Sequence, residues 1–496
     1  MLEKHYQSNL SFHSQLYELI PKDHFLVKVN ELIDFSYIYK FVKPTYNEFY
    51  GRRAVNPEIL FRLLFIQNIY NLSDERVIKD TQVNLAYKWF LGLNPEDSLP
   101  DSSLLSIFRV HKIGAGNVET LLTDLVKQCV EKGLIKSSSI LIDATHTKSK
   151  HQADKPLQVL KKAANRLLKA TKKYNHQLVK KLPTFPELPE DKWEAEKLML
   201  HYLAELGQKI EEKVPDAEGS LQERLVEAKK IVEDERLLAW KGVQTAIDPD
   251  ARFGWKSNTV SFLGYKESLA MTEDGIITGV VVEPGSASDP KALPKLIQQT
   301  EEAGVVIKET IADTAYSTST NLELLETKEI DAIMPLHPNS YGMKDELREK
   351  FIYHKDSDTV ECPMGHHSYT KRVTGSKKNG ESQRLTFYFD TQNCKECPLQ
   401  NGCYQQGAKS KSFSLPIIPS YRQKIMDLEK TEEFKIRYKC RYKIEQKNHE
   451  LKNHHGLAKT KFSRGLLGMR IQSILTCIAV NVKKVIKINE GIIASK

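Results

Sequence analysis

The sequence predicts an α/β fold: a mixed sheet preceded by a helical domain and interrupted by two insertions. Apolar runs typical of buried strands occur at 139–145 and 309–312. Two β-rich runs, 259–272 and 275–285, are joined by a Glu-Asp-Gly turn at 273–275, which is a hairpin signal. Helix-like and strand-like runs then alternate. Together these features indicate a sheet with antiparallel and parallel strands.

The composition is that of a soluble globular protein. The 496 residues are enough for about three domains. Hydrophobic residues make up 40% of the chain and charged residues 28%. The net charge of +9 weakly favours a polyanionic partner such as nucleic acid. Because the N-terminus has no apolar signal-peptide core, we expect a cytoplasmic protein whose cysteines stay reduced.

Residues 1–130 are predicted to form a helical N-terminal domain. Asn56 precedes Pro57 and Glu58, an arrangement typical of a helix start, and Ser73 begins a second helix that we expect to run to residue 90. Two interpretations of this region stay open: a small helical domain without DNA contacts, and a DNA-binding domain. The basic residues that favour DNA binding are Arg52, Arg53, Arg109 and Lys112.

Two segments of different composition interrupt the predicted sheet. Residues 151–245 are rich in Lys, Glu and Leu and predict a helical insertion with solvated helix faces. Residues 338–430 form a Cys-rich insertion that could bind zinc. The predicted core, which contains the sheet, therefore consists of residues 131–150, 246–337 and 431–490.

The core is predicted to end in two long helices, at about 431–455 and 465–487. Charged and amide side chains interrupt the second, which is the most apolar window of the chain. We therefore expect a packed helix there and no membrane span.

Acidic residues end two of the strand-like runs. Asp143 follows Ile-Leu-Ile, and Asp313 follows Thr-Ile-Ala. Acidic ligands that hold two Mg²⁺ ions roughly 3.5–4 Å apart are the requirement of two-metal phosphoryl transfer. An acid at a strand end is, taken singly, more often a turn or cap residue. The hypothesis of a metal site therefore needs a third acid.

Four polar residues in the first long helix supply that acid. At 100° per residue, Tyr438, Arg441, Glu445 and Lys452 fall on one stripe roughly 60° wide. A carboxylate, two cations and a phenol on one stripe fit a metal ligand with phosphate contacts beside it. The alternative is a set of surface salt bridges, since Arg441 and Glu445 are four residues apart.

These motifs resemble the DDE transposases of bacterial insertion sequences, in the group that carries the Tyr-Arg-Glu-Lys signature. The likeness is carried by LIDATHTKS at 141–149, IADTAYSTSTN at 311–321 and the stripe, in that order. Residues 51–77 and 90–109 also resemble the helical N-terminal domain associated with such enzymes.

The resemblance implies a ribonuclease-H-like core with Asp143, Asp313 and Glu445 as catalytic ligands of two Mg²⁺ (or Mn²⁺) ions. It also implies DNA contacts from Tyr438, Arg441 and Lys452. The expected partners are double-stranded DNA, as element ends and target, and a second copy of the chain in a synaptic homodimer. Such a protein would associate with the nucleoid when bound to DNA.

In the expected mechanism, water cuts one strand and the released 3′-hydroxyl attacks another phosphodiester, so no protein nucleophile is required. Two alternatives stay open: a metal-dependent DNA nuclease on the same core, and a non-catalytic DNA- or zinc-binding protein derived from a transposase. Four histidines near the acids receive no role, namely His146, His449, His454 and His455.

Four of the seven cysteines lie in the second insertion. Cys362 begins a Cys-Pro-x-Gly sequence, and Cys394, Cys397 and Cys403 follow as one CxxC pair with a third cysteine. This set predicts a structural zinc site, with unligated thiols as the alternative. Weaker candidates for one ligand are His366 and His367. The remaining cysteines are interpreted as ordinary helix residues, namely Cys129, Cys440 and Cys477.

Overall fold

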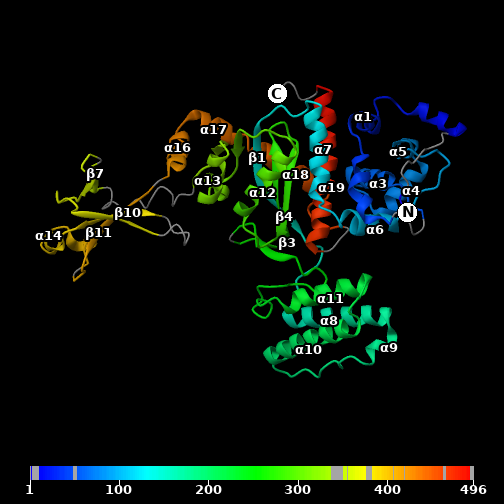
Figure 1. Ribbon diagram of the computed structural model, residues 1–496, viewed down its shortest axis with the longest axis horizontal. Helices are drawn as coiled ribbons and strands as arrows, with labels where there is room; N and C mark the ends of the chain where they lie inside the picture. Colours follow the sequence, from blue (N-terminus) through cyan, green and yellow to red (C-terminus); the bar gives the residue numbers. More distant parts are fainter. Residues whose placement is uncertain are drawn as a thin grey trace. The chain divides into compact units, whose positions relative to one another are not determined.

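The computed structural model describes residues 2, 11–47, 53–257, 259–336, 350–354, 356–375, 383–405, 407–417, 419–461 and 465–491. The chain divides into two compact units, Met1–Ala312 with Lys439–Lys496, and Asp313–Tyr438. Each unit is described by itself below, and Figure 1 labels their elements.

The first unit begins with short helices. They are η1 (Phe12–Leu19), α1 (Phe25–Leu32), α2 (Tyr37–Val42), η2 (Lys43–Thr45), α3 (Pro57–Tyr70), α4 (Asp74–Val83), α5 (Leu85–Phe90), α6 (Ser103–Ile107), the π-helix η3 (Phe108–Ile113) and α7 (Glu119–Glu131). The predicted cap residues are confirmed: the side chain of Asn56 accepts from the Glu58 N–H at 2.9 Å, and that of Ser73 from the Arg76 N–H at 3.1 Å.

The prediction of one helix from residue 74 to 90 is wrong. Asn84 adopts an extended backbone at the end of α4, and its side chain accepts from the Tyr87 N–H at 3.1 Å, which caps α5. A residue that satisfies the free N–H groups of a new first turn favours a break over continuation.

Two of the basic residues that suggested DNA binding in this region instead form hydrogen bonds within the protein. Arg109 is 2% exposed and donates to Asp74 at 2.9 Å and to Gln67 at 3.2 Å. Lys112 donates to the carbonyl oxygen of Thr45 at 2.7 Å. Arg53 is exposed, and Arg52 lies outside the described residues.

The centre of the first unit is a mixed sheet, as predicted. Its strands are β1 (Ser139–Lys148), β2 (Arg252–Trp255), β3 (Ser261–Thr272), β4 (Ile277–Pro284) and β5 (Glu309–Ile311). Antiparallel β3 pairs with β1, β2 and β4, whereas β5 joins β1 in parallel. The antiparallel strands β1, β3 and β4, together with the parallel strand β5, fit the expected ribonuclease-H-like core, to which β2 adds a short extra strand. The hairpin turn at 273–275 is confirmed, and Gly275 takes a positive φ of 91° there.

Strand β1 is longer than the sequence indicated, so the placement of Asp143 at a strand end is wrong. Pairing with β5 stops at Leu141, but pairing with β3 continues through Asp143 to Lys148. The residues that follow Asp143 are mostly polar, so a prediction based on apolar runs ends the strand too early. Strand β2 is a further element that was not predicted, and it is only four residues long.

Helices cover the sheet. Helices α7, α12 (Leu293–Glu302, after η4, Asp289–Ala292) and α19 (Gly465–Asn489) pack against β4, and α18 (Tyr442–Asn453) packs against β1. By length and composition α19 could cross a membrane, but 78% of its apolar window is buried within the protein. It therefore serves as a core helix, as expected.

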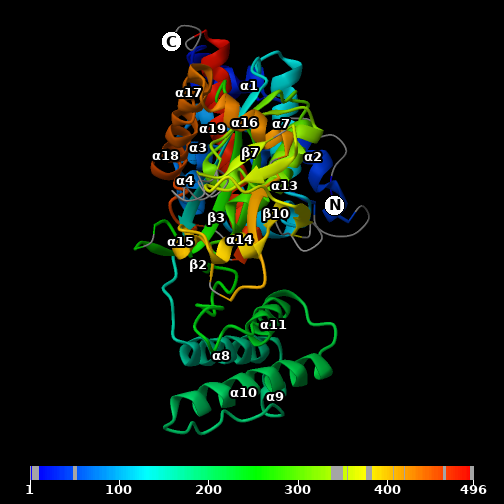
Figure 2. The ribbon, with the colours of Figure 1, turned by 90° about the vertical axis from the view of Figure 1, so that its left-hand side faces the viewer.

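The segment between β1 and β2 forms a helical bundle with its own core. Helices α8 (Pro156–Tyr174), α10 (Lys192–Lys213) and α11 (Gly219–Val232) lie side by side in both ribbon views, with α9 (His176–Val179) following α8 (Figures 1 and 2). Twenty buried hydrophobic residues form one cluster there. The two ends of the bundle meet, because the Asp154 N–H donates to the carbonyl oxygen of Gln244 at 2.7 Å.

The second unit contains smaller elements. They are η5 (Thr314–Tyr316), α13 (Ser319–Thr327), β6 (Asp331–Ile333), β7 (Ile352–His354), β8 (Thr359–Glu361), β9 (Thr370–Thr374), β10 (Arg384–Phe389), α14 (Thr391–Lys395), α15 (Gln400–Cys403), β11 (Lys411–Pro416), α16 (Ser420–Leu428) and α17 (Glu432–Lys439). Strands β9, β10 and β11 form one antiparallel sheet, and β7 and β8 form a hairpin. The buried cluster beside them consists of Val360, Phe387 and Phe389.

Candidate functional site

The predicted single helix at 431–455 is two helices. Helix α17 ends at Lys439, and α18 begins at Tyr442. At the break, the Cys440 thiol lies 3.5 Å from Glu273, and the Lys443 ammonium lies 2.8 Å from the same carboxylate. These contacts with the β3–β4 turn stabilise the interruption between α17 and α18. The helical spacing of the sequence continues through residues 440 and 441, but these tertiary contacts prevent a continuous helix there. Tyr438 therefore lies on a different helix from Glu445 and Lys452, and Cys440 is not a helix residue.

Asp143 contacts two residues from the α18 segment. One carboxylate oxygen, Oδ1, lies 3.4 Å from a terminal guanidinium nitrogen of Arg441. The other, Oδ2, accepts from the Asn448 amide at 2.9 Å. Asn448 was not singled out in the sequence, yet it lies seven residues after Arg441 and three after Glu445. That helical spacing is the signal that could have found it.

Glu445 shares the same guanidinium nitrogen. Its Oε1 lies 3.5 Å from the Arg441 nitrogen that contacts Asp143. The Glu445 side chain is 58% exposed, whereas that of Asp143 is 16% exposed. The structure thus brings together a carboxylate from the sheet and a carboxylate from a helix around one positive group, open to solvent on the helix side.

This arrangement fits divalent cations. A guanidinium nitrogen between two carboxylates marks a position where positive charge is stabilised. The Asn448 side-chain oxygen is buried and accepts no hydrogen bond within the described residues. Carboxylate and amide oxygens are the donors that Mg²⁺ and Mn²⁺ prefer.

A group of lysines lies beside the carboxylates, around His146. Lys452 Nζ is 3.5 Å from His146 Nδ1. Burial, and then the positive charges of Lys452, Lys256, Lys148 and Lys266, lower the pKa of His146 to about 4. The ring stacks on Phe262 at 4.5 Å between centroids. At neutral pH the imidazole is therefore uncharged and surrounded by cations.

Glu267 lies beneath this group and was also missed. It is fully buried on β3, and the Thr147 hydroxyl donates to it. Burial raises the pKa of Glu267 to about 7, against the opposing effects of Thr147, Lys452 and Ser473. Burial also lowers the pKa of Lys452, and the charge of Glu267 raises it. A single buried acid within a strand has no spacing signal, so the sequence alone could not identify it.

The two remaining residues of the predicted site belong to the second unit. Asp313 begins η5, and its side chain accepts from the Ala315 N–H at 2.9 Å. Tyr438 stacks on Phe434 at 5.8 Å, both on α17. Asp143, Arg441, Glu445 and Lys452 belong to the first unit.

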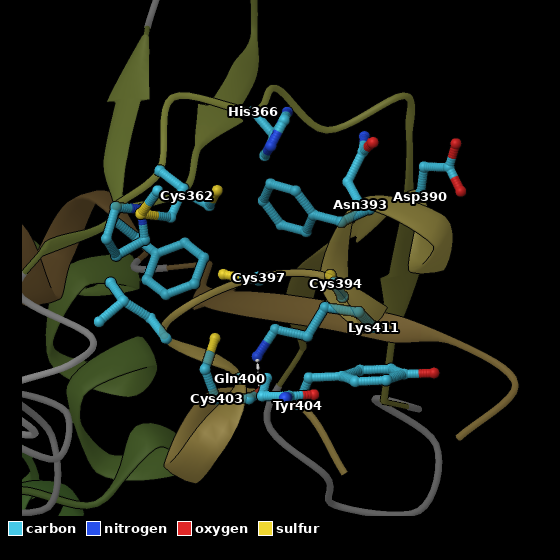
Figure 3. Close-up of a pocket in the computed structure, with 15 residues that line it drawn as sticks. Cys362, His366, Asp390, Asn393, Cys394, Cys397, Gln400, Cys403, Tyr404 and Lys411 are labelled. Atoms are coloured by element: carbon cyan, nitrogen blue, oxygen red, sulfur yellow. Dashed lines mark hydrogen bonds between the residues drawn. The ribbon is translucent and has the colours of Figure 1, made fainter. Parts of the chain in front are cut away.

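The four cysteines of the second unit line one pocket (Figure 3). Cys362 follows β8, Cys394 lies on α14, Cys397 on the next turn and Cys403 on α15. Burial, and then the neighbouring Cys403, Cys362 and Cys397, raise the pKa of the Cys394 thiol, while Lys411 opposes them. All seven cysteines lie among the described residues, and none of them forms a disulfide.

The histidines near this pocket differ in position. His366 lines it, and the His366 carbonyl oxygen accepts from the Cys362 N–H at 2.9 Å. His367 points to another group, with Nδ1 lying 3.4 Å from the Thr359 hydroxyl. Elsewhere, Cys129 and Cys477 are buried on α7 and α19, as expected of helix residues, and burial raises the pKa of each thiol.

Two segments of the chain match known families. Residues 14–111 match the transposase domain (DUF772), and residues 361–486 match the transposase DDE domain. No curated protein matches the chain significantly. Among solved structures, the chain is similar to the piggyBac transposase in a cryo-EM structure of its synaptic complex with hairpin DNA. The identity is 9% and the TM-score 0.34, over 95% of this chain and 76% of that chain.

The chain thus contains one segment that matches a transposase domain and another that matches a transposase DDE domain. The second match contains Arg441, Glu445 and Lys452 as well as the four pocket cysteines. DDE transposases use divalent metal ions, which agrees with the oxygen donors found around Arg441.

Proposed function

We propose that the protein binds the ends of an insertion sequence, cuts DNA there and joins the released end to a target. One observation carries this proposal: the Arg441 guanidinium lies between Asp143 of the sheet and Glu445 of α18. Carboxylates from two elements gathered around a positive group are what a metal site for phosphoryl transfer requires. Arg441 and Glu445 also lie within the segment that matches the transposase DDE domain.

Asp313 is the third carboxylate of the proposed site. The sequence and the expected chemistry both support this assignment. Asp313 directly follows the apolar run 310–312, which contains the end of β5. Two-metal phosphoryl transfer also needs several acidic ligands to hold its ions.

Asp143, Asp313 and Glu445 would hold two Mg²⁺ (or Mn²⁺) ions, which stabilise the charge that develops on the attacking and leaving oxygens. Asn448 keeps the Asp143 carboxylate in one orientation through its hydrogen bond. Arg441 offers paired N–H donors to a phosphate, and Lys452 offers a point charge. We assign Tyr438 a contact with the transferred DNA end.

The lysines around His146 form the proposed entry for the DNA backbone. Lys148, Lys256, Lys266 and Lys452 all act on the His146 imidazole electrostatically, so they share one neighbourhood. Lysines so grouped attract phosphates and release counterions on binding. Synapsis of two element ends requires at least a homodimer.

The pocket cysteines suit a structural Zn²⁺ ion. Zinc takes four thiolates, and Cys362, Cys394, Cys397 and Cys403 supply that number. The Cys-Pro-x-Gly turn is closed by a hydrogen bond from the Gly365 N–H to the Cys362 carbonyl oxygen at 2.8 Å. Gly365 has a positive φ of 79°, which suits glycine and lets the chain turn tightly around its first thiol.

The proposed function is tested with a DNA fragment that carries the termini flanking the gene, a supercoiled target plasmid and Mg²⁺. The native protein should cut the fragment and join its 3′-hydroxyl end to the plasmid. Asp313→Asn should abolish both steps and leave binding of the fragment unchanged. Asp331→Asn serves as the control, since Asp331 is an exposed acid on β6 of the same unit.

Retained cutting by Asp313→Asn would remove Asp313 from the site. Cutting without joining by the native protein would identify a nuclease. Binding without either step, at all divalent ions tried, would identify a non-catalytic DNA-binding protein.

A further inference from the structure

A second group of metal-binding side chains lies on the β7–β8 hairpin. Ligand atoms of His354, Glu361 and His367 lie within 4.8 Å of one another. We propose that these three residues form a transition-metal site, selective for Zn²⁺, distinct from the cysteine pocket of the same unit.

The backbone of the hairpin places the three side chains together. In the β7–β8 ladder His354 pairs with Thr359, and Ile352 pairs with Glu361. Residues two apart on a strand share a face, so His354 and Glu361 are diagonal neighbours on one face. A further bridge pairs Glu361 with His367. The site is therefore formed by paired strands, which hold its ligands at fixed positions.

The same alternation separates this group from the cysteine pocket. Val360 and Cys362 flank Glu361 on the chain and face the opposite side, where Val360 is fully buried in the phenylalanine cluster and Cys362 packs against it. His366 lines the cysteine pocket, and its neighbour His367 does not. Adjacent residues thus contribute to two different sites on two faces of β8.

The donor set favours zinc. Two imidazoles and one carboxylate are a ligand combination that Zn²⁺ accepts, with water in the fourth position. His354 Nε2 lies 2.7 Å from Glu361 Oε2, so these two potential ligand atoms are neighbours, and a ligand atom of His367 lies within 4.8 Å of both. The Thr359 hydroxyl near His367 Nδ1 can fix that ring and leave the other nitrogen for a metal.

The role of this metal would be to hold the hairpin to the segment that follows it. The buried cluster of this region is small, so a second bound ion adds stability that hydrophobic contacts do not supply. Without metal, the His354–Glu361 contact is an ordinary cross-strand hydrogen bond. That simpler interpretation is the alternative to be excluded.

The test uses the full-length protein, freed of metal by a chelator and titrated with Co²⁺ in excess Mg²⁺, which occupies the carboxylate site. Thiolate-bound Co²⁺ gives charge-transfer bands in the near ultraviolet, and Co²⁺ held by imidazole and carboxylate does not. The native chain should bind one equivalent without those bands, and His354→Ala/His367→Ala should lose that equivalent alone. His176→Ala, an exposed histidine of the helical bundle, should behave as the native chain.

A conservative variant guards against misfolding. Glu361→Gln preserves a hydrogen bond to His354 but removes the charged ligand, and should weaken Zn²⁺ binding at this site by roughly tenfold or more. Zinc affinity is measured by competition with a chromophoric chelator. Unchanged stoichiometry in the double variant, or unchanged affinity in Glu361→Gln, would show that the three side chains form a hydrogen-bonded group only.

Discussion

The carboxylate site of the first unit and the cysteine pocket of the second differ in what holds their ligand side chains in place. Asp143 projects from a strand whose neighbours Ile140, Leu141 and Ile142 are fully buried. The sheet and its helices therefore hold that carboxylate in place whether or not a metal is bound.

The cysteine pocket has no comparable support. Among the described residues of the Cys-rich segment, the buried hydrophobic cluster has three members, whereas the helical bundle between β1 and β2 has twenty. A segment with so little buried apolar surface cannot offset its loss of chain entropy without a bound ion or cross-link. In one region the fold positions the ligands, and in the other the ligands would hold the fold.

The largest effect should follow from removing zinc from the cysteine pocket. Zinc binding to structural sites is worth about 10–16 kcal/mol in small zinc domains. Cys394→Ser, or a zinc chelator, should therefore leave residues 350–430 open to limited proteolysis while the helical bundle stays protected. Cys440→Ser is the control, because that thiol lies outside the pocket. Persistent protection of the Cys-rich segment in zinc-free protein would contradict the comparison.

The next effect concerns activity without unfolding. Asp143→Asn removes a ligand charge worth several kcal/mol, so DNA cutting in Mg²⁺ should fall on the order of 10³-fold. The thermal unfolding temperature should change by only a few degrees, since the sheet around residue 143 is intact. Cleavage assays and thermal melts of the same preparation measure both. A large fall in unfolding temperature would mean that Asp143 is needed for the fold as well.

A smaller loss is expected from the residue that orients Asp143. Asn448→Ala removes the hydrogen bond to Asp143 Oδ2. Loss of such an orienting contact typically costs about 10–100-fold in metal affinity or activity. The Mg²⁺ concentration for half-maximal cutting should rise, and added Mg²⁺ should restore part of the rate. Asn453→Ala, at the exposed end of α18, provides the comparison, and an equal loss there would indicate damage to the helix.

The smallest effect is a protonation change. The pKa of His146 is about 4 in the folded protein, below the usual value of about 6.5 for histidine. As pH falls from 6.5 towards 4, the unfolded chain takes up this proton before the folded one, so His146 reduces stability in that range and is neutral in effect above it. NMR titration of its ring protons should give this low pKa, and a bound DNA duplex should raise it by neutralising the lysines. An unchanged pKa with DNA bound would place the backbone elsewhere.

Local features of the fold could be predicted because their causes are local. The caps at Asn56 and Ser73 and the turn at 273–275 depend on a few adjacent residues, and the structure confirms them. Alternating helix-like and strand-like runs likewise predicted the mixed sheet.

Features decided by distant contacts could not be predicted. The helix break at Cys440 depends on Glu273, which is far away in the sequence. The extension of β1 beyond Asp143 depends on pairing with β3. Within the candidate site, spacing identified Arg441, Glu445 and Lys452, but burial of Glu267 and the contact of Asn448 with Asp143 arise only when strand and helix come together.

The meeting of Asp154 and Gln244 at the base of the helical bundle has a consequence for how such chains diversify. The polypeptide leaves the sheet and returns to nearly the same point, so a short linker could replace the helical bundle with little change in loop-closure entropy. During evolution the bundle could then be exchanged, shortened or enlarged without moving the carboxylates of the sheet. The stretch from Arg441 to Lys452 has no such freedom, because one inserted residue would rotate half of its contacts by about 100° away from the sheet.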